Sequence, residues 1–268
     1  MTLLAAWVGM DCKKDGDKIS SIYFASDSRF SWNAYSHYDE GVKVFCSLKY
    51  PYIFGYCGDV LFPLHSLERI IYKIDSDLLF PPNIASFNDK LEIIKNEIES
   101  SLHNYPPLPQ DFSIICACRE SYYDFHLGKI WSSGKIVKCK ELPLHLEEGS
   151  HIVYCDGSGK NDFDKVVTAL AKDKNPNEGT SRFYYHCIAK TIRDHSSPTV
   201  GGVPQLVGLY RKGNGLFFGI IEHGKRYVLG KELKFHPNCL QIQWRNCNFE
   251  RINPETMILK DGAQAQPF

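Results

Sequence analysis

The sequence predicts an α+β protein built as a four-layer αββα sandwich. Along its 268 residues, patterns typical of strands and helices follow in the order strands, two helices, strands, two helices, strands. A sheet that helices cover on only one face leaves its other face in need of an apolar partner, and a second sheet is the simplest partner. Each helix pair would then cover the outer face of one sheet.

The first half of the chain supplies one sheet and one helix pair. Short apolar runs between polar turns indicate strands at residues 3–9, 19–26, 42–46 and 52–57. Apolar residues at helical spacing then indicate two helices, around residues 64–74 and 91–102. The proline-rich stretch 105–109 ends the second helix, because proline lacks the amide hydrogen that a helix needs.

The second half repeats this order. Strands are expected at residues 112–118, 122–127, 130–131, 152–155, 205–210 and 216–221. Two helices, at about 162–171 and 181–193, separate the last two strands from the others. Residues 1–232 would form the main domain, and residues 233–268, which have no clear pattern, would be a C-terminal extension or appendage.

Composition excludes several classes of function. The 31 basic residues equal the 31 acidic residues and no basic stripe runs along the sequence, so nucleic acid is not an expected partner. No run of about eighteen apolar residues occurs, so no membrane span is expected. Ten scattered cysteines without a C-x-x-C pair favour free thiols in a reducing, cytoplasmic compartment. No cofactor is expected, and a zinc site of His236, Cys239 and Cys247 is a weak alternative because the spacing fits no usual site.

Three motifs in the first part of the chain point to chemistry. Thr2 follows the initiator Met1 and leads directly into an apolar strand, and such a small second residue permits removal of Met1. Asp27 ends the next strand, within the sequence Asp-Ser-Arg. Lys43 follows sixteen residues later. A carboxylate and an ammonium group near a chain terminus can together tune the pKa of a nucleophile.

Further motifs follow in the second part of the chain. Gly58 lies between an expected strand and an expected helix. Ser158 belongs to a Gly-Ser-Gly segment, Asp194 lies thirty-six residues beyond it, and Ser197 follows three residues later. Taken singly, each motif has an ordinary structural explanation, such as a turn, a solvated charge or a loop. Their joint order and intervals favour a functional interpretation.

In this order and spacing, the motifs resemble proteasome β-subunits and bacterial HslV, which are N-terminal nucleophile (Ntn) hydrolases. The resemblance covers about residues 2–220. It implies a threonine-type peptidase in which Thr2, exposed by removal of Met1, attacks a peptide bond and forms an acyl-enzyme. It also implies a polypeptide substrate, a homo-oligomeric ring, and an ATP-dependent unfoldase or other subunits as partners. The segment between Thr2 and Asp27 is longer than is usual in that family, and Gly58 falls one residue later relative to Lys43.

The resemblance also implies a role for each motif. The free amine of Thr2 would act as the base, Asp27 and Lys43 would tune the pKa of the nucleophile, and Gly58 would stabilise the oxyanion through its backbone N–H. The remaining catalytic candidates, which would orient the Thr2 amine, are Ser158, Asp194 and Ser197.

Substrate contacts are predicted at three residues. Phe30 and Ser31 would line the strand that pairs with an extended substrate, and Tyr56 would form the floor of a side-chain pocket. Tyr56 is equally well explained as packed core. Two other functions remain open: an inactive ring subunit or scaffold, and an Ntn amidohydrolase acting on a small amide.

Overall fold

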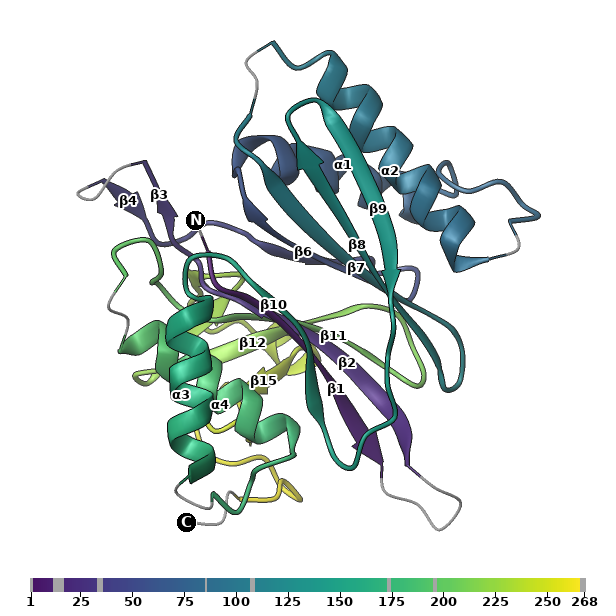
Figure 1. The fold of residues 1–268 in the computed structure, drawn as a ribbon. Coiled ribbons are helices and arrows are strands. Elements are labelled where there is room, and N and C mark those ends of the chain that lie inside the picture. Colours follow the sequence, from purple (N-terminus) through teal and green to yellow (C-terminus); the bar gives the residue numbers. More distant parts are fainter. Residues whose placement is uncertain are drawn as a thin grey trace.

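The computed structural model describes residues 2–11, 17–32, 36–84, 86–106, 109–172, 175–194 and 197–265. These residues form three sheets and four α-helices (Figure 1). The largest sheet has the strand order β10-β1-β2-β11-β12-β13-β14, with β15 beside β12 and β16 beside β15. Its strands are β1 (Leu4–Asp11), β2 (Lys18–Ser26), β10 (His151–Asp156), β11 (Gln205–Tyr210), β12 (Leu216–Glu222), β13 (Lys225–Val228), β14 (Lys231–Glu232), β15 (Gln243–Arg245) and β16 (Arg251–Ile252).

A five-stranded sheet and a short hairpin complete the β-structure. The five-stranded sheet contains, in spatial order, β5 (Val44–Cys46), β6 (Tyr52–Gly58), β7 (Phe112–Ser121), β8 (Asp124–Ser133) and β9 (Ile136–Leu142). The hairpin pairs β3 (Phe30–Ser31) with β4 (His37–Tyr38). The helices are α1 (Leu61–Asp75), α2 (Phe87–His103), α3 (Lys160–Lys172) and α4 (Ser181–Arg193), with a 3-10 turn η1 (Pro237–Gln241) near the end.

Strand β1 is buried on both faces, which explains its nearly continuous apolar sequence. Trp7 belongs to an apolar cluster that includes side chains of α3 and α4. Leu4 and Val8, which point to the other face, belong to a cluster that includes side chains of the five-stranded sheet. Because side chains alternate along a strand, β1 contributes to two cores at once and is thereby fixed in register.

The helices pack through single apolar stripes. Leu67 and Ile70 of α1 and Ile94 and Ile98 of α2 are buried against strands of the five-stranded sheet. Helix α2 begins at a proper cap, because the Ser86 side chain accepts a hydrogen bond from the backbone of the helix's first turn. These two helices lie near the stretches that the apolar spacing indicated.

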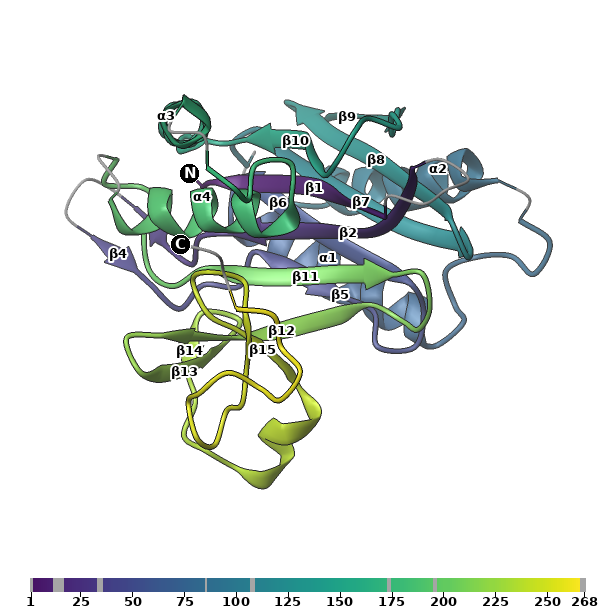
Figure 2. The ribbon, with the colours of Figure 1, turned by 90° about the horizontal axis from the view of Figure 1, so that it is seen from below.

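The tail of the chain joins the large sheet. Strand β15 pairs in parallel with β12, and Trp244 of β15 is buried in a small cluster with Ile221. Figure 2 shows β13, β14, β15 and the yellow end of the chain gathered on the side of β11 that faces away from β1. Residues 233–268 therefore supply strands to the sheet that also carries β1.

The predicted fold class, an α+β four-layer αββα sandwich, is wrong. The described chain is mostly antiparallel β-structure, with sixteen strands in three sheets and only four α-helices. The prediction missed strands that are charged or short. β9 exposes Lys138 and Lys140, and β14 is a short charged strand, because strands at a sheet edge need no continuous apolar face.

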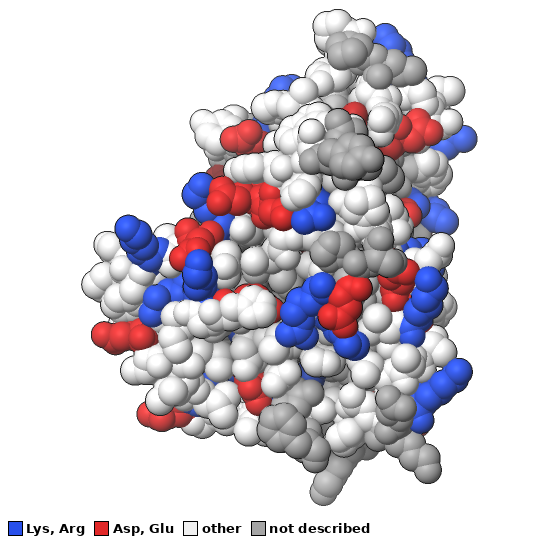
Figure 3. Space-filling model, turned by 90° about the vertical axis from the view of Figure 1, so that its left-hand side faces the viewer, with Lys and Arg blue, Asp and Glu red and all other residues white. Residues whose placement is uncertain are grey.

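The surface carries charges of both signs. Figure 3 shows lysines and arginines interspersed with aspartates and glutamates on one face of the molecule. Among the described residues, no helix combines the length and apolar character needed to cross a membrane. Met1 and part of the proline-rich stretch 105–109, both used in the sequence analysis, lie outside the described residues.

Candidate active site

The candidate nucleophile lies immediately before β1. Thr2 is fully buried, and its Oγ1 is buried without a hydrogen-bond partner among the described residues. Its carbonyl oxygen accepts a hydrogen bond of 3.3 Å from the backbone N–H of Gly159. Gly157 lies so close that a Cβ there would fall 2.0 Å from the Thr2 carbonyl oxygen, so only glycine fits. The backbone of Thr2 is held in place while its hydroxyl is left unsatisfied.

A buried ion pair lies next to this chain start. Lys43 Nζ and Asp27 Oδ1 are 2.9 Å apart, and neither side chain has any solvent exposure. The same Asp27 oxygen accepts a hydrogen bond of 2.9 Å from the backbone N–H of Leu3, the residue after Thr2. The pair is therefore joined directly to the residue that follows the candidate nucleophile.

The second carboxylate oxygen of Asp27 accepts hydrogen bonds from two further segments of the chain. Oδ2 accepts hydrogen bonds from the backbone N–H groups of Arg29, at 3.1 Å, and Gly201, at 3.2 Å. The carboxylate thus has four N–H donors from four places in the chain. A buried carboxylate with this many donors is satisfied in its hydrogen bonding and is held in one orientation.

Lys43 sits in a pocket made by residues from three elements. Burial lowers its pKa, and the neighbouring Asp27 carboxylate opposes that shift. Its backbone N–H donates to Gln205 Oε1 at 3.1 Å, and the Phe30 ring centroid lies 5.9 Å from its Nζ. Gln205, which begins β11, was missed in the sequence, where it reads as the polar start of an apolar strand.

Ser158 and Ser197, two of the three residues expected to orient the Thr2 amine, are linked through Thr199. Ser158 Oγ lies 2.8 Å from Thr199 Oγ1, and Ser197 Oγ lies 2.7 Å from the same atom. Thr199 was not identified from the sequence, because a threonine two residues after Ser197 carries no motif of its own. The hydroxyl groups form a short chain that begins next to Gly157 and Gly159, which contact the Thr2 backbone.

Asp194 does not join this chain of hydroxyl groups. Its carboxylate forms an ion pair of 2.5 Å with Lys190 and is more than half exposed. Lys190 and nearby Arg193 lower the pKa of Asp194, mainly through the Lys190 hydrogen bond. The aspartate lies just after the end of α4, where the side chain four residues earlier is within reach. The structure therefore places Asp194 with its own helix and not with Ser158 or Ser197.

Gly58 occupies a tight junction between β6 and α1. Its φ of 97° is left-handed, and an added Cβ would lie 2.3 Å from the Asp111 carbonyl oxygen. The following residue, Asp59, accepts a hydrogen bond from the backbone N–H of Phe62 at 3.0 Å and so caps the start of the helix. Within the described chain, no hydrogen bond joins Gly58 to Thr2.

The three predicted substrate contacts lie in different environments. Tyr56 is fully buried in the core under α1 and α2, and its hydroxyl donates to the Val42 carbonyl oxygen at 3.0 Å. This environment is that of packed core. Phe30 and Ser31 form β3, so both lie on the short hairpin beside Lys43.

No family model matches the chain, and no curated protein matches it. The functional interpretation therefore rests on the geometry around Thr2.

One group of side chains in the described part of the chain has metal-ligand spacing. Potential ligand atoms of Glu120, Asp124 and His126 lie within 4.8 Å of one another. His126 Nδ1 is hydrogen-bonded to Glu141 Oε1 at 2.8 Å, and its Nε2 lies 3.2 Å from Asp124 Oδ1, contacts that account for the cluster without a metal. The weak zinc alternative of His236, Cys239 and Cys247 does not form such a group within the described residues.

Proposed function

We propose that the chain is a threonine-type amide or peptide hydrolase whose nucleophile is the Thr2 hydroxyl in the chain that has lost Met1. The observation that carries the proposal is the placement of a fully buried Lys43–Asp27 ion pair against the start of β1, beside an unsatisfied Thr2 Oγ1. Buried ion pairs are costly to assemble, and tuning the pKa of a nucleophile is one function that justifies them.

The proposed reaction uses groups that the chain itself supplies. The free amine of Thr2, with an ordinary pKa near about 8, takes the proton of the Thr2 hydroxyl as Oγ1 attacks the carbonyl carbon of the substrate. The C–N bond then breaks, and the departing amine takes that proton from the Thr2 ammonium group. An ester between Thr2 and the acyl group remains. Water hydrolyses this ester and regenerates the hydroxyl.

The neighbouring groups would act on charge and position. The Lys43 cation is linked through Asp27 to the backbone N–H of Leu3, and its positive field would favour the deprotonated forms of the Thr2 amine and hydroxyl. Asp27 holds this cation in place and at the same time fixes the Leu3 N–H. We assign the stabilisation of the oxyanion to the backbone N–H of Gly58, next to the N-terminus of α1.

A second candidate is an inactive subunit or scaffold, and two observations favour it. Asp194 is paired with Lys190 at the surface, so the set expected to orient the amine is incomplete. Tyr56 lies in the packed core, away from any substrate pocket. A scaffold would gain nothing from the buried Lys43–Asp27 pair, whose assembly costs free energy that an apolar pair would not.

The cellular setting is part of the proposal. The nine described cysteines are free thiols, which fits a reducing compartment, and we place the protein in the cytoplasm. From the resemblance, we also propose a homo-oligomeric ring that acts on polypeptides delivered by an ATP-dependent unfoldase.

Intact mass spectrometry separates the two candidates. Purified protein is treated with a peptide epoxyketone, which reacts with both the hydroxyl and the amine of an N-terminal threonine. We expect loss of Met1 and one adduct on the wild type, and no adduct on Thr2→Ala. Thr2→Ser keeps a hydroxyl beside a free amine, so it should form the adduct and keep measurable hydrolysis of fluorogenic peptides, while Thr2→Ala should lose several orders of magnitude.

Two outcomes would decide against the hydrolase. One is retention of Met1 in protein that still hydrolyses peptides, because the mechanism needs the free amine. The other is a chain without Met1 that forms no adduct and behaves identically to Thr2→Ala, which would favour the scaffold.

A further inference from the structure

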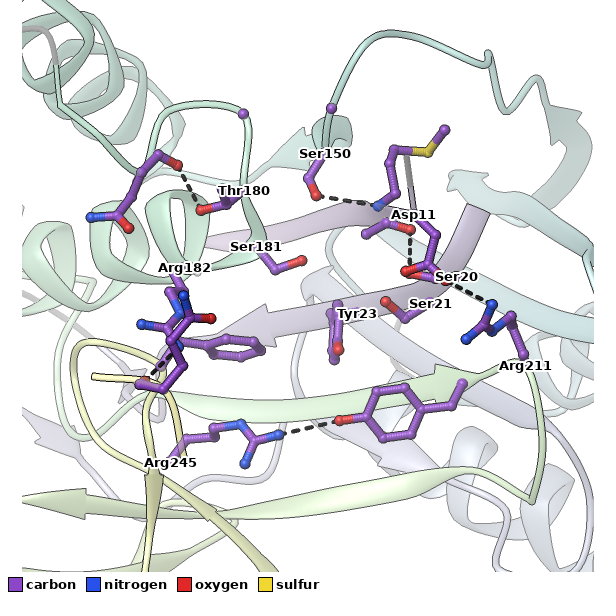
Figure 4. Close-up of a pocket in the computed structure, with 18 of the residues that line it drawn as sticks. Asp11, Ser20, Ser21, Tyr23, Ser150, Thr180, Ser181, Arg182, Arg211 and Arg245 are labelled. Carbon is purple, nitrogen blue, oxygen red and sulfur yellow. Dashed lines mark hydrogen bonds and ion pairs between the residues drawn. The ribbon is translucent and has the colours of Figure 1, made fainter. Parts of the chain in front are cut away.

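A cavity of about 980 Å³ lies at the far end of β1 from Thr2. It is formed by the ends of β1 and β2, the start of α4, the end of β11 and the tail, and Figure 4 shows side chains from these segments facing a common space. With a rise of about 3.3 Å per strand residue, the cavity is roughly 25 Å from Thr2. Its size is that of a small-molecule site.

The lining is strongly basic although the whole chain is neutral. Five cationic side chains line the cavity, and the single carboxylate is that of Asp11, which gives a net charge of +4 (5 − 1). The cations are Arg182, Arg211, Lys212, Arg245 and Arg251. Asp11 already pairs with Arg211 at 2.6 Å. In the described part of the chain, no carboxylate forms an ion pair with any of the other four.

Arg245 is the cation of this lining whose burial costs the most free energy. The residue is 6 % exposed, and its Nε is buried without a hydrogen-bond partner among the described residues. Its guanidinium group donates to Tyr210 Oη at 3.2 Å and lies over the Phe249 ring. These neutral contacts position the cation but do not neutralise it. A buried cation without a counter-ion is costly, and a bound anion removes that cost.

A second unsatisfied donor lies at the start of α4. Arg182 Nη1 is buried without a partner among the described residues, while its Nη2 donates to the Gln264 carbonyl oxygen at 2.6 Å. Ser181, the first residue of the helix, also lines the cavity, so the positive end of the helix dipole adds to the field. In Figure 4, Arg182 and Arg245 lie on one side of the cavity and Arg211 on the other.

Hydroxyl groups complete the lining. Ser20, Ser21 and Ser150 line the space away from Arg245, and Ser181 lies next to Arg182 (Figure 4). Gly9 provides room there, because a Cβ at this position would lie 2.4 Å from Ser21 Oγ. Guanidinium groups and hydroxyl donors arranged around one space are the usual partners of phosphate oxygens.

We propose that this cavity binds a ligand with several phosphate groups, either a nucleotide or a free polyphosphate chain, at a site separate from Thr2. Fixed cations on opposite walls favour a ligand that carries several negative charges along its length over a single inorganic ion. Tyr122, which is 43 % exposed, offers a flat surface on which a base can stack.

Calorimetric titration of the full chain tests the proposal. Inorganic tripolyphosphate, ATP and adenosine are titrated into wild type, Arg182→Gln, Arg245→Gln and the control Arg69→Gln, which changes an exposed arginine on α1. We expect tripolyphosphate to bind with an affinity that falls as salt rises, and each of the first two variants to weaken it about tenfold. Arg69→Gln should bind as the wild type does. If Arg245→Gln fails to fold, the half-buried Arg182 still provides the test.

The outcomes separate ligand sources and hypotheses. Tighter binding of ATP than of tripolyphosphate identifies a nucleotide, and equal binding identifies a free polyphosphate. Absence of binding by both, equal weakening by Arg69→Gln, or binding of adenosine as tight as that of ATP would overturn the proposal. Thr2→Ala protein should bind as the wild type does, so failure of the proposed hydrolase and failure of this site remain distinguishable.

Discussion

Replacing Lys43 with methionine should destabilise the protein by about 3 kcal/mol. Methionine keeps most of the side-chain volume but leaves the Asp27 carboxylate buried at zero exposure without its cation. Breaking a buried pair by removing one partner costs about 3–5 kcal/mol. We expect the lower end, because backbone N–H groups of Leu3, Arg29 and Gly201 still donate to Asp27.

The measurement is urea unfolding followed by fluorescence, with the slope of the transition checked for change. Asp27→Asn should cost at least as much as Lys43→Met, because an amide offers one acceptor oxygen where four donors converge. In the double variant, the cost should fall short of the sum of the single costs by about 1 kcal/mol or more, the signature of direct coupling. The control Lys165→Met removes an exposed ion pair with Asp162 and should cost less than about 0.5 kcal/mol.

A cost below about 1 kcal/mol for Lys43→Met would refute this reasoning, as would simple additivity in the double variant. The stability loss also has a practical consequence for the proposed hydrolase. Turnover of Lys43→Met must be measured at a temperature where the variant is folded, since otherwise unfolding would imitate the loss of a tuning group. The folded fraction should be inactive while its circular dichroism matches that of the wild type.

Two further predictions concern the backbone and the thiols. Gly58→Ala should lower the free energy of unfolding by about 2 kcal/mol or more, because the added Cβ would collide with the Asp111 carbonyl oxygen. The control Gly134→Ala also has a positive φ but open space around it, so it should lose only about 1 kcal/mol in urea unfolding. Equal losses would show that the structure relieves the collision. Burial raises the pKa of Cys57 to about 12 and raises the pKa of Cys116 far above its ordinary 9.0. Above pH 9 the unfolded state therefore binds fewer protons than the folded state, and the free energy of unfolding should fall with rising pH, by about 1.4 kcal/mol per thiol and pH unit. Unfolding at pH 8 and pH 10 checks this sign, and greater stability at pH 10 would contradict it.

Apolar periodicity predicted the positions of the helices and strands that form the cores, but it did not predict the fold class. The apolar stripes of α1 and α2 and the apolar run of β1 could be recognised in the sequence, because buried positions in these elements carry apolar residues. The edge strands β9 and β14 were not recognised, because the sequence of an edge strand is free to be charged, and β13 was missed because it has only four residues, two of which are basic. Counting only the strands with an apolar pattern led to the wrong class.

The basic cavity could not be predicted at all. Its four arginines are residues 182, 211, 245 and 251, which come from separate segments and follow no spacing rule. Each one alone reads as an ordinary surface charge on a chain whose net charge is zero. Only the packing of the tail against β12 and the start of α4 brings them together.

The two aspartates of the candidate active site show that sequence spacing can identify a candidate residue without predicting where its side chain points. Asp27 follows a strand whose partners are fixed on both sides, and the nearby cation Arg29 pairs with Asp39. The Asp27 carboxylate is therefore reached by N–H groups of Leu3 and Gly201, 24 and 174 residues away. Asp194 follows a helix, where Lys190 lies one turn back and can pair with it at little entropic cost. A cation close in sequence competes with partners that are distant in sequence. Asp194 accordingly pairs with Lys190 and not with the residues near Thr2.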